Sequence, residues 1–193
     1  MSEEKLRLAV LVGTVRDVRL APVFAGWFLR AARAHGRFEV DVVDAKYIAL
    51  PLAVDRRSAE ISAEPRKVTP VLASADAFVV VTGEYNHSFP AALKNLIDWH
   101  RTEWQAKPVG FVSYGGMSGG LRAVEQLRQV FAELHAMTVR DSISFHKATA
   151  LLDATGRIRD EEAYAPTVKS MLGQLEWWSL ALREARDKRP YEA

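Results

Sequence analysis

The stretch Asp76–Trp99, DAFVVVTGEYNHSFPAALKNLIDW, carries the strongest fold signal in the chain. It opens with the uninterrupted apolar run 77–81, and β-branched residues in such a run favour a strand buried on both faces of a sheet. A polar loop, 83–87, follows, and apolar residues then recur at helical spacing. We expect Ser88 to cap this helix with its hydroxyl and Pro90 to lie in its first turn. The polar loop is therefore expected at the carboxyl end of a strand, where open α/β sheets bind ligands.

Length and composition restrict the class of protein. The chain has 193 residues, of which 49% are hydrophobic and 26% charged, as expected for a single globular domain spanning 1–193. The net charge of only +2 argues against a dedicated nucleic-acid-binding protein. The absence of cysteine excludes disulfides, thiol catalysis and cysteine metal sites, and no spacing of His, Asp and Glu suggests another metal site. The charged start, 1–5, is neither a signal peptide nor a membrane span, so we expect a soluble, cytoplasmic protein.

Strands and helices are predicted to alternate along the rest of the chain. Apolar runs predict four further strands, at 6–12, 38–43, 108–113 and 138–145. Helices are predicted at 20–35 with a stop at Gly36, at 66–74 with an interruption at Pro70, at an amphipathic stretch after Gly120, and at 165–186. An irregular surface loop, with or without a short helix, is expected over 45–65. This alternation implies a parallel sheet covered by helices on both faces, and five strands favour the doubly wound, flavodoxin-like order 2-1-3-4-5.

That strand order brings three unusual loops, 13–19, 83–88 and 114–120, to one edge of the sheet. The first offers the groups of a phosphate site, because helix N-termini and arginines attract phosphate: Thr14, Arg16 and Arg19. The other two offer an aromatic ring, amide groups and glycines that let a flat ligand approach the backbone: Gly83, Glu84, Tyr85, Asn86, Tyr114, Gly115 and Gly116. A phosphate site beside a flat polar slot is typical of a flavin mononucleotide (FMN) site.

Each loop also has a plainer interpretation. A βα loop with a tyrosine and an asparagine can be a simple polar turn, and arginines in a loop are commonly solvated surface charges. The glycine pairs at 115–116 and 119–120 can form a flexible turn. They follow the fourth predicted strand instead of the first, so the fingerprint of a dinucleotide-binding fold does not apply. The prediction of FMN therefore depends on the three loops meeting.

The central stretch resembles the signature of the NAD(P)H-dependent FMN reductase family. The similarity lies in Glu84-Tyr85-Asn86, Ser88, Pro90, Leu93-Lys94-Asn95 and Ile97-Asp98-Trp99, and extends to 107–109, 120–128 and 156–162. Gly13-Thr14-x-Arg16 is similar to the family's phosphate loop, which often has serine where this chain has Arg19. The family usually has proline in place of Gly83. The resemblance implies a flavodoxin-like fold, with the FMN phosphate in the 14–19 loop and the isoalloxazine ring against Glu84-Tyr85-Asn86 and 114–116.

The resemblance also implies a function. An enzyme of this kind takes hydride from NAD(P)H on bound FMN and passes it in a second step to a quinone or another small acceptor. No catalytic side chain is expected, and the implied assembly is a homodimer or homotetramer without nucleic-acid or membrane partners. Arg56, Arg57 or Arg66 are candidates for the 2′-phosphate of NADPH, or are ordinary surface charges. Two rivals are a flavodoxin-type electron carrier, a class that is typically strongly acidic, and a flavin-free binding protein on the same fold.

Overall fold

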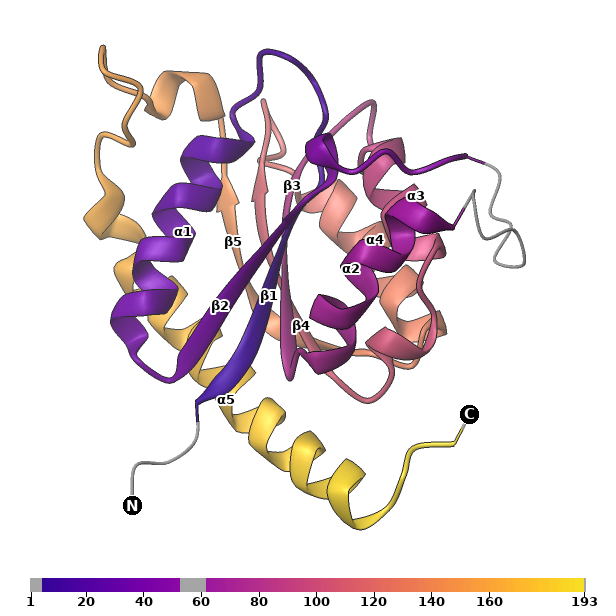
Figure 1. Ribbon diagram of the computed structural model, residues 1–193. Helices are drawn as coiled ribbons and strands as arrows, with labels where there is room; N and C mark the ends of the chain where they lie inside the picture. The colour runs from indigo at the N-terminus through magenta and orange to yellow at the C-terminus, as the bar shows by residue number, and fades with distance from the viewer. Residues whose placement is uncertain (1–4, 53–61, 193) are drawn as a thin grey trace.

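Five parallel strands form the centre of the computed structural model, which describes residues 5–52 and 62–192 (Figure 1). They are β1 (Leu6–Val12), β2 (Phe38–Asp44), β3 (Ala77–Gly83), β4 (Pro108–Tyr114) and β5 (Met137–Phe145). Their order across the sheet is β2-β1-β3-β4-β5, and every neighbouring pair is parallel. The predicted doubly wound, flavodoxin-like topology is therefore confirmed.

Helices cover both faces of the sheet (Figure 1). One face carries α1 (Ala21–His35) and α5 (Ala165–Lys188), and the other carries α2 (Ala63–Ser74), α3 (Ala91–Asp98) and α4 (Leu121–Glu133). Short 3₁₀ turns lie in the connections: η1 (Ala45–Tyr47), η2 (Thr102–Trp104), η3 (Ala148–Leu151) and η4 (Glu161–Tyr164). No helix in the described part of the chain is long and apolar enough to cross a membrane.

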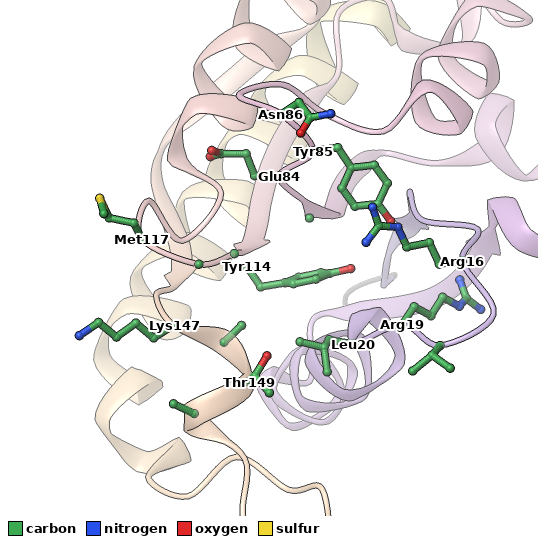
Figure 2. Close-up of a pocket in the computed structure, with 16 residues that line it drawn as sticks. Arg16, Arg19, Leu20, Glu84, Tyr85, Asn86, Tyr114, Met117, Lys147 and Thr149 are labelled. Carbon is green, nitrogen blue, oxygen red and sulfur yellow. The ribbon is translucent and has the colours of Figure 1, made fainter.

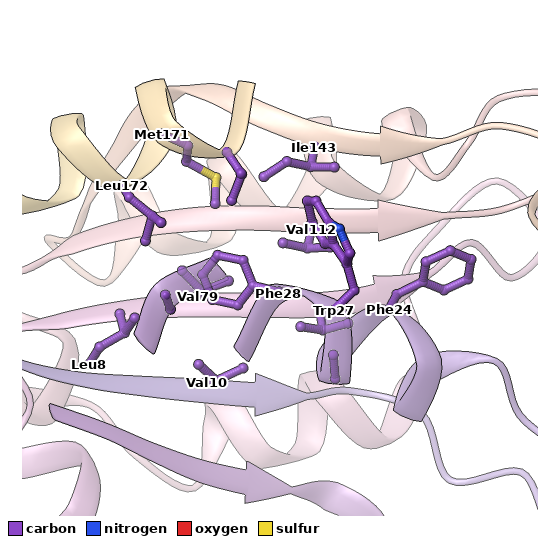
Figure 3. Close-up of a cluster of buried hydrophobic side chains, with 14 of the residues drawn as sticks. Leu8, Val10, Phe24, Trp27, Phe28, Val79, Val112, Ile143, Met171 and Leu172 are labelled. Carbon is purple, nitrogen blue, oxygen red and sulfur yellow. The ribbon is translucent and has the colours of Figure 1, made fainter. Parts of the chain in front are cut away.

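The central strand β3 divides its side chains between two hydrophobic cores. Val79 and Val81 point into the core under α1 and α5, part of which is shown in Figure 3, whereas Phe78 and Val80 point into the core under α2, α3 and α4. Every residue of β3 is buried. Because successive side chains of a strand point to opposite faces, a strand between two helical layers is apolar along most of its length. This is the pattern that the run 77–81 predicted.

The prediction for the second helix needs correction, whereas that for the first is confirmed. The α2 helix begins at Ala63 and continues through Pro70 to Ser74, so the predicted interruption was wrong. Val68 and Leu72 are buried on either side of the proline, and their packing keeps both halves of the helix on the sheet. The helix predicted to start at Leu20 is confirmed as α1, and Gly36 ends it in the left-handed conformation (φ 81°), as expected.

Ser88 does not cap α3, contrary to the prediction. The N-cap position is Pro90, and no side chain caps that end of the helix. The Ser88 hydroxyl instead donates to Oε1 of Gln126 on α4, 2.5 Å away. The serine therefore links the loop after β3 to helix α4. The local sequence around Ser88 does not reveal this contact.

The predicted irregular loop 45–65 falls only partly within the described residues. Its first residues form the η1 turn, where the Asp44 carboxylate accepts the backbone N–H of Lys46 at 3.0 Å. Arg56 and Arg57, the candidates for a 2′-phosphate, lie outside the described residues.

A buried lysine lies at the opposite edge of the sheet from the three loops. Lys107 is 6% exposed, and its Nζ donates to the carbonyl oxygens of Leu72 and Ala73, at 3.0 and 2.8 Å, where α2 ends. Burial, reinforced by the nearby Arg186 charge, lowers the pKa of Lys107 from its ordinary value near 10.5 to about 8.

This lowered pKa predicts that Lys107 makes stability depend on pH in the alkaline range. Between the two pKa values the unfolded chain holds a proton that the folded chain has lost, so stability rises with pH. Relative to a Lys107→Met variant, the wild-type free energy of unfolding should increase by up to about 3 kcal/mol between pH ~8 and ~10.5. Urea denaturation of both proteins at several pH values measures this difference. Stability curves that stay parallel over the range would contradict it.

Candidate functional site

A pocket of about 720 Å³, here called the central pocket, opens at the carboxyl ends of β1, β3 and β4 (Figure 2). Every predicted site residue except Thr14 lines it: Arg16, Arg19, Gly83, Glu84, Tyr85, Asn86, Tyr114, Gly115 and Gly116. Thr14 is fully buried behind this wall, with its Oγ1 3.4 Å from the Tyr114 hydroxyl. The three loops that the sequence singles out therefore meet in one place.

The loop after β1 presents unpaired backbone donors. In the part of the chain that the structure describes, the N–H groups from Thr14 to Leu20 donate no hydrogen bond to another protein group. Leu20 is the N-cap of α1, and no side chain caps this end of the helix. A loop of free N–H groups running into a helix N-terminus is suited to bind an anion.

The two arginines of this loop have different surroundings. The Arg16 guanidinium is exposed and lies 4.2 Å from the centre of the Tyr85 ring, a cation–π contact that leaves its N–H groups available. The Arg19 guanidinium instead forms a two-pronged salt bridge with Asp44, at 2.7 and 2.6 Å, and donates to the Thr14 carbonyl at 2.6 Å. The Arg19 side chain is only 6% exposed. Arg19 therefore holds the loop to the end of β2, and Arg16 is the arginine free to meet a ligand.

The loop after β3 is a tight hairpin. Tyr85 and Ser88 exchange both backbone hydrogen bonds, at 2.8 and 3.1 Å, around Asn86 and His87. Both central residues have positive φ, 49° and 74°, as in the two-residue turns that reverse a chain most sharply. Asparagine tolerates this conformation better than most residues. The turn thus presents Tyr85 and Asn86 at the wall of the central pocket.

The Glu84 carboxylate turns away from the cavity toward α4. Its oxygens accept from Nε of Arg122 at 2.6 Å and from the Ser118 hydroxyl at 2.5 Å. Burial disfavours the ionised carboxylate, but the hydrogen bonds from Arg122 and Ser118 outweigh it and lower the pKa of Glu84 below its ordinary value. The Glu84 side chain thus fastens the loop after β3 to Ser118 in the loop after β4.

Tyr114 forms the floor of the central pocket (Figure 2). The residue is 7% exposed, and its ring stacks on Phe24 of α1 with ring centres 4.9 Å apart. Burial raises the pKa of the Tyr114 phenol to about 12, so it is neutral at physiological pH. A side-chain carbon at position 83 would lie 3.1 Å from this ring. Glycine at 83 therefore makes room for the tyrosine.

The sequence did not single out another wall of the pocket, built by Lys147–Ala150 after β5, nor the rim residues Val18, Leu20 and Met117. The backbone N–H of Lys147 donates to the Gly116 carbonyl at 2.7 Å, and that of Ala148 donates to Gly115 at 2.9 Å. These bonds hold the loop after β4 in place. A signal was available, because residues that follow β5 end at the same edge of the parallel sheet as the other loops.

Comparison with known families agrees with this geometry. A family model described as NADPH-dependent FMN reductase matches residues 6–150, which contain the whole sheet and all three loops. The chain belongs to the NADPH-dependent FMN reductase family. It is therefore a member of a family of oxidoreductases.

Individual members of the NADPH-dependent FMN reductase family are similar over most of the chain. An NAD(P)H-dependent FMN reductase of Saccharomyces cerevisiae is 34% identical over 140 residues, covering 65% of this chain and 73% of the yeast protein. An NADPH:quinone oxidoreductase of Arabidopsis thaliana is 29% identical over 189 residues, covering 92% and 94%.

Solved structures show the same fold at lower identity. The flavoenzyme NAD(P)H:(acceptor) oxidoreductase FerB of Paracoccus denitrificans superposes with a TM-score of 0.69 at 21% identity, covering 93% of this chain and 98% of that one. A flavodoxin from Pseudomonas aeruginosa superposes with a TM-score of 0.57 at 19% identity, covering 89% of this chain and 99% of that one.

The unequal surroundings of Arg16 and Arg19 predict different defects when each is replaced by alanine. Arg16→Ala should weaken FMN binding at least tenfold without changing stability, because an available charged donor is lost. Arg19→Ala should lower the free energy of unfolding by roughly 2–4 kcal/mol, because it leaves Asp44 without its partner in a mostly buried setting. FMN titration and urea denaturation measure the two effects. Arg140→Ala, at a 93% exposed arginine, is the control and should change neither.

Glu84 should make stability depend on pH in the acid range. Because its folded pKa is below the ordinary value, its contribution is present above pH ~4.5 and is lost as the pH falls through the folded pKa. Glu84→Gln should therefore lose about 1–2 kcal/mol at neutral pH and approach wild-type stability in acid. Glu125→Gln, at a 75% exposed carboxylate on α4, serves as the matched control. A Glu84→Gln deficit that is constant from pH 7 to pH 3 would refute this role.

Proposed function

We propose that this protein is an NAD(P)H-dependent oxidoreductase that binds FMN and reduces quinones or similar small acceptors by a ping-pong reaction. The observation that carries the proposal is the row of N–H groups from Thr14 to Leu20 that have no partner within residues 5–52 and 62–192, beside Arg16 and next to an open slot. The slot is walled by residues 84–86 and 114–116. A phosphate and a flat ring system attached to it fit these two parts of the central pocket.

The donor set of the pocket matches FMN by its chemistry. The loop 14–19 would hold the phosphate through backbone N–H groups and the Arg16 guanidinium. The Tyr85–Asn86 turn and the Gly115–Gly116 backbone would line the flat ring. When bound, FMN supplies the transfer of hydride from NAD(P)H to an acceptor.

The protein's own side chains hold the loops of the central pocket in place and keep water from its floor. Tyr114 closes the floor of the pocket with a neutral, buried ring, and so keeps water from that side. The bond from Ser118 to Glu84 fixes the spacing between the loops after β3 and β4, and Arg122 ties Glu84 to α4. The Glu84 carboxylate is held by Arg122 and Ser118, so it is not placed to act as an acid or base. We therefore assign no catalytic side chain.

We propose that the protein works as a homodimer or homotetramer in the cytoplasm. Val18 and Met117 line the central pocket yet are 93% and 91% exposed, and large apolar side chains at the mouth of a pocket favour contact with a second subunit. A quinone-like acceptor is supported by relatives whose names specify quinones, such as the 2-hydroxy-1,4-benzoquinone reductase of a Burkholderia species, 30% identical over 164 residues.

Two rival functions have less support from the sequence and the structure. A flavodoxin-type electron carrier is typically strongly acidic, whereas this chain has a net charge of +2 and matches the reductase family model. A flavin-free protein on this fold is disfavoured because the chain belongs to the NADPH-dependent FMN reductase family and has Arg16 and the Tyr85–Asn86 turn at the central pocket.

Absorbance spectroscopy of the purified protein tests the proposal. We expect a flavin band that bleaches when NADPH is added without oxygen and returns when a quinone is added afterwards. Bleaching before any acceptor is present supports a ping-pong order, because reduction then needs no second substrate. A band that NADPH and NADH leave unbleached would indicate an electron carrier. No band, even after incubation with FMN, would overturn the FMN assignment.

A further inference from the structure

A second hollow, about 630 Å³ in volume, lies between α1 and the segment 153–161 that leads into α5. We call it the α1 hollow. Its walls continue those of the central pocket: Leu20 and Ala150 line the central pocket, while Pro22 and Asp153 line the α1 hollow. The two cavities are therefore neighbours along the first turns of α1.

Gly26 lies in the middle of α1 and lines this hollow. A Cβ atom at this position would meet no other atom within 4 Å, so close packing does not require glycine there. Glycine in a helix interior is less stable than alanine, and its presence calls for another reason. A side chain at 26 would extend into the hollow. Glycine thus leaves the surface of α1 open at this point of the hollow.

Arg157 and Arg159 lie on the wall opposite α1, in a hairpin held by backbone hydrogen bonds. Leu152 and Ile158 pair across it, and Ile158 is buried, which leaves Arg157 and Arg159 on either side of it in exposed positions. The backbone N–H of Arg159 donates to the Leu151 carbonyl at 2.9 Å, and that of Asp153 donates to the Arg157 carbonyl at 2.8 Å. The backbone of both arginines is therefore fixed.

The acidic groups of the hollow are already engaged. Glu161 pairs with Arg30 at 2.7 Å. The backbone N–H of Arg157, the Thr155 hydroxyl and, more weakly, the Arg159 charge keep the pKa of Asp153 below its ordinary value. Within the described residues, neither the Arg157 nor the Arg159 guanidinium donates a hydrogen bond to a protein group. The hollow therefore combines an open surface of mixed polar and apolar groups with two available guanidinium groups.

We propose that the α1 hollow binds the adenosine 2′-phosphate of NADPH, and that it makes the enzyme prefer NADPH to NADH. The proposal rests on the function proposed above, in which the nicotinamide enters the central pocket. The adenosine would lie on α1 at Gly26, and Arg157 and Arg159 would donate to the doubly charged phosphate, for which arginine is well suited. Leu20 and Gly26 are ~9 Å apart along the helix, a span that an extended dinucleotide can bridge.

Arg66, the other described candidate for this phosphate, lies elsewhere. It lines a separate hollow of about 300 Å³ with Trp99 and Arg101. None of the residues that line it is a near neighbour in sequence of a residue that lines the central pocket, whereas Pro22 and Asp153 of the α1 hollow closely follow Leu20 and Ala150. Arg66 therefore serves as a control.

Calorimetric titration with 2′,5′-ADP and 5′-AMP tests the site directly, because only the first carries a 2′-phosphate. The wild-type protein should bind 2′,5′-ADP at least tenfold more tightly. The double variant Arg157→Ser/Arg159→Ser should lose this preference, and Gly26→Leu should weaken both nucleotides by filling the hollow. Arg66→Ser and Gly173→Leu, the latter at an exposed α5 glycine that also has open space around it, should bind like wild type.

Steady-state kinetics provide the second readout. The ratio of kcat/KM for NADPH to that for NADH should fall at least tenfold in the Arg157→Ser/Arg159→Ser variant. An unchanged ratio, or equal wild-type binding of the two nucleotides, would overturn the proposal. If the wild-type protein oxidises neither NADPH nor NADH, the proposed function is wrong, and the calorimetric titration still decides whether the hollow binds a 2′-phosphate.

Discussion

The site depends on the divergence of β1 and β3, two neighbouring parallel strands. The hydrogen bond from the Gly13 N–H to the Val81 carbonyl, at 3.0 Å, is the last one between them. Beyond it the chain after β1 passes to α1 on one face of the sheet, and the chain after β3 passes to α3 on the other (Figure 1). A crevice must open where two adjacent chains leave in opposite directions. The loops after β4 and β5 extend it to one side, which gives the central pocket its length.

Charged groups around this crevice are divided between holding the loops and meeting a ligand. Arg19 and Arg122 are each committed to a carboxylate, Asp44 and Glu84, and each pair ties one loop to a neighbouring element. Arg16 has no such partner among the described residues and faces the cavity. The committed pairs keep the pocket's shape before a ligand arrives, and this reduces the ordering that binding would otherwise require. The free arginine supplies attraction without weakening the fold.

The sequence was sufficient for the strand order and for which loops meet, because both follow from short-range patterns. The run 77–81 identifies a doubly buried strand, and strand count with alternation selects the topology. The direction of individual side chains was not predictable in this way. Arg19 contacts Asp44, 25 residues away, and Glu84 contacts Arg122, 38 residues away. The sequence alone does not identify partners that are so far apart in the chain. A residue that is correctly predicted to lie at the pocket can therefore still direct its side chain away from it. Ser88 was misassigned for the same reason, since its partner Gln126 is 38 residues distant.

Glycine illustrates how the same residue type can serve opposite purposes around one site. At Gly83 a Cβ would lie 3.1 Å from the Tyr114 ring, so a larger residue there would push against the ring. At Gly26 a Cβ would meet nothing within 4 Å, so steric crowding cannot be the cause. Gly83 leaves room for the Tyr114 ring, which forms the pocket floor. Gly26 leaves the space beside α1 empty. In the sequence, both positions are simply a glycine within an apolar element. The two cases differ only in which atoms surround the position that a Cβ would occupy.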